Sequence, residues 1–251
     1  MLSNVFSRLV LQKAALLDPT ARTGRPRTLD NENALQCIFK VCRTGMQWRE
    51  IDAPVSYTTV FRRMHRWGTR GVFEEAYAAT LNTYKRMCPP TRYCVDSSFV
   101  KNAYGRQGVG RNPTDRGRKA IKLSVVTDQH GVVHGASLAP ANIPDVSLLE
   151  HTLCGMIGKL DALPLYADRG YDSRNNRRVC TSFGLKDRIF RRRTKTTKRA
   201  NAKRVVVENT FSWIDEYRRL LYLYEHRPQT HRCFLLLALG NLLTHRFSLP
   251  V

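Results

Sequence analysis

The chain has 251 residues, of which 42% are hydrophobic and 9% aromatic. This size and composition predict a globular protein, either one large domain or a domain with a smaller one attached, and exclude a disordered chain. Lysine and arginine number 42 against 20 aspartates and glutamates, a formal net charge of +22 that favours a polyanionic partner such as nucleic acid. An anionic membrane surface is the alternative, although the basic residues are spread along the whole chain.

The N-terminal segment and the cysteines bear on where the protein acts. Residues 1–18 are amphipathic but contain neither a continuous apolar core nor a cleavage site, so we predict no secretory signal; a transit peptide is the alternative. No apolar run reaches the length of about 18 residues that a membrane span needs. The seven cysteines form no Cys-x-x-Cys pair, which predicts reduced thiols, several of them buried, and no zinc site. We expect an intracellular protein, in the bacterial cytoplasm or nucleoid, or in the nucleus of a eukaryotic host.

Residues 1–88 are predicted to form a small helical domain. The apolar residues of "NALQCIFKVCRTG" (33–45) recur at helical spacing, Asp30 or Asn31 can cap the helix, and Gly45 ends it.

A second helix is predicted in "SYTTVFRRMHRWGTRG" (56–71), and it is basic. Val60, Met64 and Trp67 form an apolar stripe, and we place the basic residues off it, namely Arg62, Arg63, His65 and Arg66. Short helices of which the last is basic are typical of helix-turn-helix-like DNA-binding domains. The alternative is a plain helical bundle with solvated arginines.

Residues 89–251 are predicted to form a second domain. Strand-like runs are "YCVDSSFV" (93–100), "IKLSVVTD" (121–128), "VVHGASLAPA" (132–141), "PLYAD" (164–168) and "KDRIFRR" (186–192), and helical runs are 145–157, 173–184 and 205–224. The order is three strands, helix, strand, helix, strand, helix. It predicts a ribonuclease-H-like α/β fold, a mixed sheet with helices on both faces.

Three carboxylates stand at informative places in this order. Asp96 is in the first strand, Asp168 ends the fourth, and Glu208 lies one turn into the last helix. The first and fourth strands are neighbours in this topology and the last helix packs beside them, so the three can converge. Clustered carboxylates repel one another unless cations lie between them, which predicts two Mg²⁺ ions, with Mn²⁺ as substitute, for phosphodiester chemistry. The alternatives are an ion pair at Asp168 and a solvated Glu208.

Several blocks carry a family resemblance. "YCVDSSFVK", "GRNPTDRGRKAIKLSVVTDQHGVVHGASLAPANIPDVSLLE", "LPLYADRGYDSRNNRR" and "RVVVENTFSWIDEYRRLLYLYEHRPQTHRCFLLLAL" resemble, in order and spacing, the DDE transposases of the insertion-sequence-five (IS4/IS5-like) group. The resemblance covers nearly everything from residue 91 to 246, and the N-terminal part resembles the DNA-binding region of the same group. It implies that Asp96, Asp168 and Glu208 are the catalytic, metal-binding triad.

The resemblance also implies partners and an activity. These are DNA, as terminal inverted repeats and as target, and a homodimer or higher oligomer that performs metal-dependent cleavage and strand transfer; no membrane partner is expected. Alternatives are an endonuclease without strand transfer and a domesticated DNA-binding protein that has lost catalysis.

Basic residues supply the predicted DNA contacts. From residue 188 to 204 there are nine lysines and arginines and no acid, which favours a clamp on the DNA backbone over a solvated loop. The full set of predicted contacts is Arg62, Arg63, Arg66, Arg111, Arg116, Arg118, Lys119, Arg169, Tyr171, Arg191, Arg192, Arg193, Lys195, Lys198, Arg204, Arg218 and Arg219.

Overall fold

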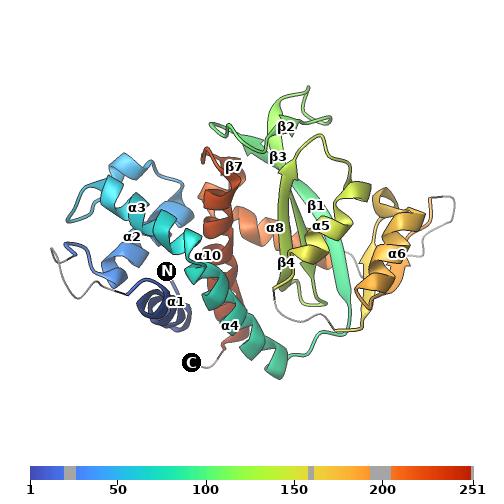
Figure 1. The fold of residues 1–251 in the computed structure, drawn as a ribbon, viewed down its shortest axis with the longest axis horizontal. Coiled ribbons are helices and arrows are strands. Elements are labelled where there is room, and N and C mark those ends of the chain that lie inside the picture. The colour runs from blue at the N-terminus through green and yellow to red at the C-terminus, as the bar shows by residue number, and fades with distance from the viewer. Residues whose placement is uncertain (20–26, 158–160, 193–204, 250–251) are drawn as a thin grey trace. The chain divides into compact units, whose positions relative to one another are not determined.

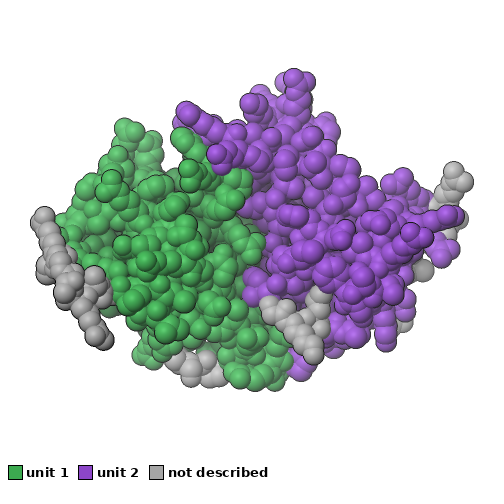
Figure 2. All heavy atoms as spheres, in the orientation of Figure 1, with its two compact units in different colours: residues 1–87, 214–251 green, residues 88–213 purple. Residues whose placement is uncertain are grey.

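The structure is a computed structural model, and it describes residues 1–19, 27–157, 161–192 and 205–249. The chain forms two compact units, one of residues 1–87 with 214–251 and one of residues 88–213 (Figure 2). The first unit thus takes in the C-terminal segment, which the sequence assigned to the second domain. In the described ranges, no helix combines the length and the hydropathy needed to cross a membrane.

The first unit is helical. Its elements are α1 (Asn4–Leu17), α2 (Asn31–Thr44), η1 (Trp48–Glu50), α3 (Tyr57–Thr69), α4 (Val72–Met87), α9 (Arg218–Leu221), β7 (Tyr222–Leu223) and α10 (Pro228–Phe247). Most of α10 is buried, and it packs against α1, α2, α3 and α4. The Phe6 ring of α1 lies so near α10 that a Cβ at Gly240 would be 2.0 Å from it. The C-terminal segment joins this unit because α10 is apolar on every side and needs helices all around it.

The predicted boundaries of the second helix along the chain, α2, are confirmed. Asp30 accepts a hydrogen bond from the Asn33 backbone N–H, and Gly45 ends the helix with a φ of 72°. The connection from α2 to α3 runs from residue 45 to 56 and includes η1, so it is longer than the turn of about 3–4 residues in a helix-turn-helix. The helical character is confirmed, without the tight turn.

The second unit is built on a mixed sheet. Its elements are β1 (Tyr93–Asn102), β2 (Gly110–Arg111), β3 (Lys119–Thr127), β4 (Val133–Pro140), η2 (Asp145–Ser147), α5 (Leu149–Cys154), β5 (Pro164–Ala167), η3 (Arg169–Tyr171), α6 (Arg174–Ser182), β6 (Lys186–Ile189) and most of α8 (Val205–Asp215). The antiparallel pairs β4–β3 and β3–β1 are followed by the parallel pairs β1–β5 and β5–β6. The resulting order β4-β3-β1-β5-β6 is the predicted ribonuclease-H-like sheet, of which Figure 1 labels β4, β3 and β1.

One face of this sheet carries the core of the unit. Val95 of β1 and Ala167 of β5 are buried in one cluster with residues of α5 and α6. The Thr210 hydroxyl of α8 donates to the carbonyl of Gly131, which lies on the turn between β3 and β4, at 2.9 Å. Side chains alternate between the faces of a strand, so Asp96, next to Val95, lies on the face away from the core cluster.

The last predicted helix, 205–224, is wrong as a single element. The structure ends α8 at Asp215 and starts the short α9 at Arg218, with Tyr217 in an extended conformation between them. Tyr217 is buried, and its hydroxyl accepts a hydrogen bond from Asn241 Nδ2 of α10 at 2.8 Å. This tertiary contact overrides the helical spacing of the sequence.

Candidate functional site

Asp96 and Asp168 lie beside each other on two neighbouring strands. Strands β1 and β5 are parallel, with Tyr93 opposite Leu165 and Cys94 opposite Tyr166. Asp96 and Asp168 each follow the second of these pairs by two residues (96 − 94 and 168 − 166). Both residues therefore lie just beyond the paired part of two adjacent strands, Asp96 within β1 and Asp168 directly after β5. The structure places these two predicted residues on neighbouring segments of the sheet.

Main-chain hydrogen bonds orient both carboxylates. Asp96 Oδ1 accepts from the backbone N–H of Ser97 at 2.8 Å, and Asp168 Oδ1 accepts from that of Gly170 at 2.6 Å. Asp168 is the N-cap of η3, directly after β5, and both aspartates are half-buried. Half-buried carboxylates that lie near each other repel and favour a cation between them.

Glu208 lies on α8 and its side chain is exposed. The helix is anchored two residues further on by the Thr210 bond to Gly131, and a Cβ on Gly131 would lie 2.7 Å from the Trp213 ring. In the part of the chain that the structure describes, no three acidic, histidine or cysteine side chains come together as a metal centre. Among the described residues, Glu208 forms no such group with Asp96 and Asp168.

The chemistry of the donor set fits a hard divalent cation. Asp96, Asp168 and Glu208 offer carboxylate oxygens only, which Mg²⁺ and Mn²⁺ accept and which soft metals disfavour. The pair at the strand ends holds two of these groups in fixed orientations.

Three of the predicted DNA contacts are buried. Arg63 is 4% exposed, donates to the Leu29 carbonyl at 3.0 Å and lies against the Trp67 ring. Arg219 is 5% exposed and pairs with Glu225 Oε1 at 2.6 Å. These two guanidinium groups are occupied inside the first unit, so they do not face DNA.

Tyr171 is the third buried residue, with no exposed surface in the core of the second unit. Burial raises the pKa of its phenol, and the nearby carboxylates of Asp145 and Asp96 raise it further. The sequence placed Tyr171 on the path of DNA; the structure corrects this, because the ring is buried in the core of the second unit.

Other predicted contacts are exposed. Arg62 and Arg66 lie on the surface of α3, where Arg66 Nε also lies 3.1 Å from the buried carboxylate of Asp18. The remaining exposed members are Arg111, Arg116, Arg118, Lys119, Arg169, Arg191, Arg192 and Arg218. Arg193, Lys195, Lys198 and Arg204 lie outside the described residues.

The loop of residues 112–118, here called the Asn112 loop, carries some of these arginines. Asn112 is buried, and its Oδ1 accepts from the backbone N–H and the hydroxyl of Thr114 at 2.9 and 2.8 Å. Its carbonyl accepts from Gly117 N at 3.0 Å, and Arg116 takes the left-handed conformation with a φ of 50°. A loop whose backbone is fixed by hydrogen bonds and whose arginine side chains are exposed is suited to contact phosphates.

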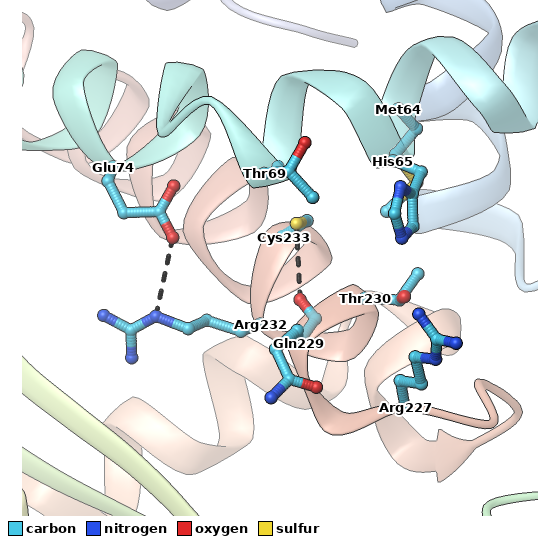
Figure 3. A pocket seen from close by; sticks show the side chains of 10 residues that line it. Met64, His65, Thr69, Glu74, Arg227, Gln229, Thr230, Arg232 and Cys233 are labelled. Atoms are coloured by element: carbon cyan, nitrogen blue, oxygen red, sulfur yellow. Dashed lines mark hydrogen bonds and ion pairs between the residues drawn. The ribbon is translucent and has the colours of Figure 1, made fainter.

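A cavity of about 250 Å³ lies between α3, α4 and the start of α10 within the first unit (Figure 3). In its wall Arg232 Nε lies 3.6 Å from Glu74 Oε1. The Cys233 thiol donates to the Gln229 carbonyl at 3.3 Å, and burial raises its pKa to about 12. This thiol is neutral at physiological pH and is a poor nucleophile, so we place the chemistry at the aspartates and not in this cavity.

Comparisons with known proteins agree over most of the chain. Residues 88–242 match the family "Transposase DDE domain", and residues 11–77 match "Putative transposase of IS4/5 family". The "Putative transposase for insertion sequence element IS402" of Burkholderia cepacia is 35% identical over 162 residues, which are 59% of this chain and 72% of that protein. The "Insertion element IS402 uncharacterized 16.2 kDa protein" of the same organism is 27% identical over 111 residues, 39% of this chain and 76% of that protein.

Two solved structures are distantly similar. The "Crystal structure of a pre-cleavage Mos1 transpososome" is 12% identical with a TM-score of 0.31, over 91% of this chain and 82% of that one. The "Crystal structure of the Mos1 mariner paired end complex with Mn" is 14% identical with a TM-score of 0.30, over 88% and 79%. Because the DDE-domain match alone spans more than half of the sequence, the chain belongs to the DDE transposases of the IS4/IS5 family of insertion sequences.

Proposed function

We propose that the protein binds the terminal inverted repeats of its insertion sequence, cleaves the DNA there and joins the freed end to target DNA. The observation that carries this proposal is the pair of Asp96 and Asp168, each two residues beyond the Cys94–Tyr166 pair of adjacent parallel strands and each oriented by a backbone N–H. In a family of transposases, such a pair is suited to hold the metal ions of phosphodiester cleavage.

In this proposal Asp96 and Asp168 hold divalent cations, Mg²⁺ or Mn²⁺, and Glu208 is the third carboxylate. Two such ions, when bound, activate a water or a 3′-hydroxyl and stabilise the leaving oxygen. The chain's own contribution is positional: the Ser97 and Gly170 N–H groups fix the two aspartates. Glu208 lies exposed on α8, and its assignment rests on the chain's membership of the DDE transposase family.

Two surfaces divide the DNA contacts. On α3, Arg62 is exposed and forms no part of the core, so we assign it to sequence recognition. In the second unit, the exposed cations of the Asn112 loop and its flank contact phosphates irrespective of sequence, namely Arg111, Arg116, Arg118 and Lys119. Arg169, Arg191 and Arg192 supply further phosphate contacts beyond β5 and β6. Because an element has two ends, we expect a homodimer or higher oligomer on DNA.

The test uses the purified full chain and duplex DNA that ends in the inverted repeat of its own element. Nicking is expected with Mg²⁺ or Mn²⁺ and none with a chelator. Asp168→Asn should abolish cleavage and spare binding, because it removes a metal ligand and no phosphate contact. Glu150→Gln, which changes an exposed acid on α5, is the matched control and should cleave normally. Added target DNA should receive the cleaved end.

Three outcomes would overturn parts of this proposal. Equal cleavage with and without chelator would refute the metal mechanism. Cleavage without joining would identify an endonuclease. Specific binding without cleavage by the wild-type chain would identify a DNA-binding protein that has lost catalysis.

A further inference from the structure

A buried lysine and a third aspartate lie directly behind the aspartate pair. Asp145 Oδ1 accepts from Ser97 Oγ at 2.6 Å and from Lys122 Nζ at 3.0 Å. The Lys122 side chain is 6% exposed, donates also to the Ile143 carbonyl at 2.9 Å and lies 4.9 Å from the Phe99 ring centroid. Burying a lysine in the middle of a sheet costs free energy, because its ammonium group loses its hydration. Here a carboxylate, a carbonyl and an aromatic face compensate the charge.

This network reaches Asp96 through a single residue. The Ser97 hydroxyl donates to Asp145, and the backbone N–H of the same residue donates to Asp96 Oδ1 at 2.8 Å. Fixing the Ser97 side chain on Asp145 therefore also restrains the amide that orients Asp96.

The network reaches Asp168 from the other side, across the turn of η3. Gly170 donates its N–H to Asp168 Oδ1 at 2.6 Å. A Cβ built on Gly170 would lie 2.9 Å from that oxygen and 3.7 Å from Asp145 Oδ2. The second oxygen of Asp145 thus lies against the turn that holds Asp168.

We propose that Asp145, held in place by Lys122, positions both metal-binding aspartates. The inference rests on the proposed function, since it gives Asp145 a task toward the ions that Asp96 and Asp168 hold. Asp145 is a positioning residue in this scheme, because its Oδ1 is committed to Ser97 and Lys122. Partners that orient metal ligands typically contribute about 10- to 100-fold to metal affinity or activity.

The experiment measures Mn²⁺ binding by the full chain without DNA, from the electron paramagnetic resonance signal of free Mn²⁺. Asp145→Ala should weaken binding by about tenfold or more, and Ser97→Ala should weaken it in the same direction. Asp145→Asn keeps an acceptor oxygen for both donors and should recover much of the loss. Glu150→Ala, which removes an exposed carboxylate on α5, is the matched control and should bind as the wild type does.

Lys122→Met separates positioning from charge. If the lysine acted by charge alone, its removal would tighten Mn²⁺ binding, because a cation near the ligands repels another cation. If it holds Asp145, its removal should weaken binding as Asp145→Ala does. The double variant Lys122→Met/Asp145→Ala should then bind Mn²⁺ no more weakly than the more affected of the two single variants, since both changes remove the same support. Tighter or unchanged binding by Lys122→Met would overturn the proposal.

Thermal melting of each variant, followed by circular dichroism, exposes a merely structural role. A lower melting temperature with wild-type Mn²⁺ affinity would overturn the proposal. Ser97→Ala, the mildest change, keeps the test decisive if Asp145→Ala does not fold. If the wild type binds Mn²⁺ and Asp168→Asn does not, while Ser97→Ala and Asp145→Ala both bind normally, only this inference fails. Absence of Mn²⁺ binding and of cleavage in the wild type would overturn the proposed function as well.

Discussion

Asp96 and Asp168 each lie two residues beyond the point where Cys94 of β1 lies opposite Tyr166 of the parallel strand β5. The register that aligns them is set by the core on the other side of the sheet. Val95 and Ala167, one residue before each aspartate, are both buried there. A slip by one residue would turn these apolar side chains outward, so hydrophobic packing holds the two carboxylates level.

The first prediction concerns the turn that orients Asp168. Gly170→Ala would bring a Cβ to 2.9 Å from Asp168 Oδ1 and should displace the carboxylate. We expect cleavage to fall by roughly tenfold while binding of duplex DNA is kept. Rate measurements at saturating metal, beside gel-shift titrations, check this.

Gly184→Ala is the control for Gly170→Ala, with the opposite expected result. Gly184 has a φ of 71°, and a Cβ built on it would have no neighbour within 4 Å, so alanine there introduces backbone strain and no contact. It should lower stability by about 1 kcal/mol and leave cleavage unchanged. A normal cleavage rate in Gly170→Ala would show that the turn tolerates the side chain and does not tune Asp168.

The second prediction separates two adjacent arginines of α3. Arg62→Gln should weaken binding to the inverted repeat and leave the free energy of unfolding unchanged, because Arg62 is exposed. Arg63→Gln should lower the free energy of unfolding by about 2–3 kcal/mol, because Arg63 is buried and donates to the Leu29 carbonyl. Urea denaturation and gel shifts on both variants test the contrast, and equal effects of the two on binding would refute the assignment.

The sequence could predict the sheet and the placement of Asp96 and Asp168 at neighbouring strands, because strand runs of apolar residues and their order suffice for both. It could not predict which arginines and lysines are buried and which are exposed, since tertiary packing decides that. Arg63 follows Val60 by three residues and precedes Trp67 by four, so it lies on the buried stripe of α3, a spacing that could have revealed its burial. A lone lysine in the apolar run of β3 was the comparable signal for Lys122. By contrast, α10 is apolar on all sides and offers no periodicity.

The third prediction concerns the Asn112 loop. Replacing Arg111, Arg116 and Arg118 together by glutamine should weaken binding to all DNA sequences alike. Each lost phosphate contact should reduce the slope of log K against log salt by about 0.9 on duplex DNA. The pair of Arg118 with Asp115 is 4.0 Å long and largely exposed, so its loss should scarcely change stability. Arg8→Gln on α1 is the control and should keep the slope; an unaltered slope in the triple variant would refute the loop's role.

The fourth prediction follows from His231 of α10, which is fully buried. Burial, aided by the neighbouring cation of Arg219, lowers the pKa of its imidazole to about 4. In the unfolded chain the pKa is about 6.5, so the unfolded state binds the proton more strongly. The stability contributed by the neutral ring is complete above pH 6.5 and is lost as the pH falls toward 4. Between pH 7 and pH 5 this loss amounts to about 2 kcal/mol.

His231→Leu removes the titrating ring and should flatten this part of the pH profile. The free energy of unfolding, measured with urea at pH 7 and at pH 5, should therefore drop by about 2 kcal/mol more in the wild type than in the variant. His151→Leu, at an exposed position of α5, is the matched control and should keep the wild-type profile. Parallel profiles of the wild type and His231→Leu would show that the buried imidazole does not govern acid stability.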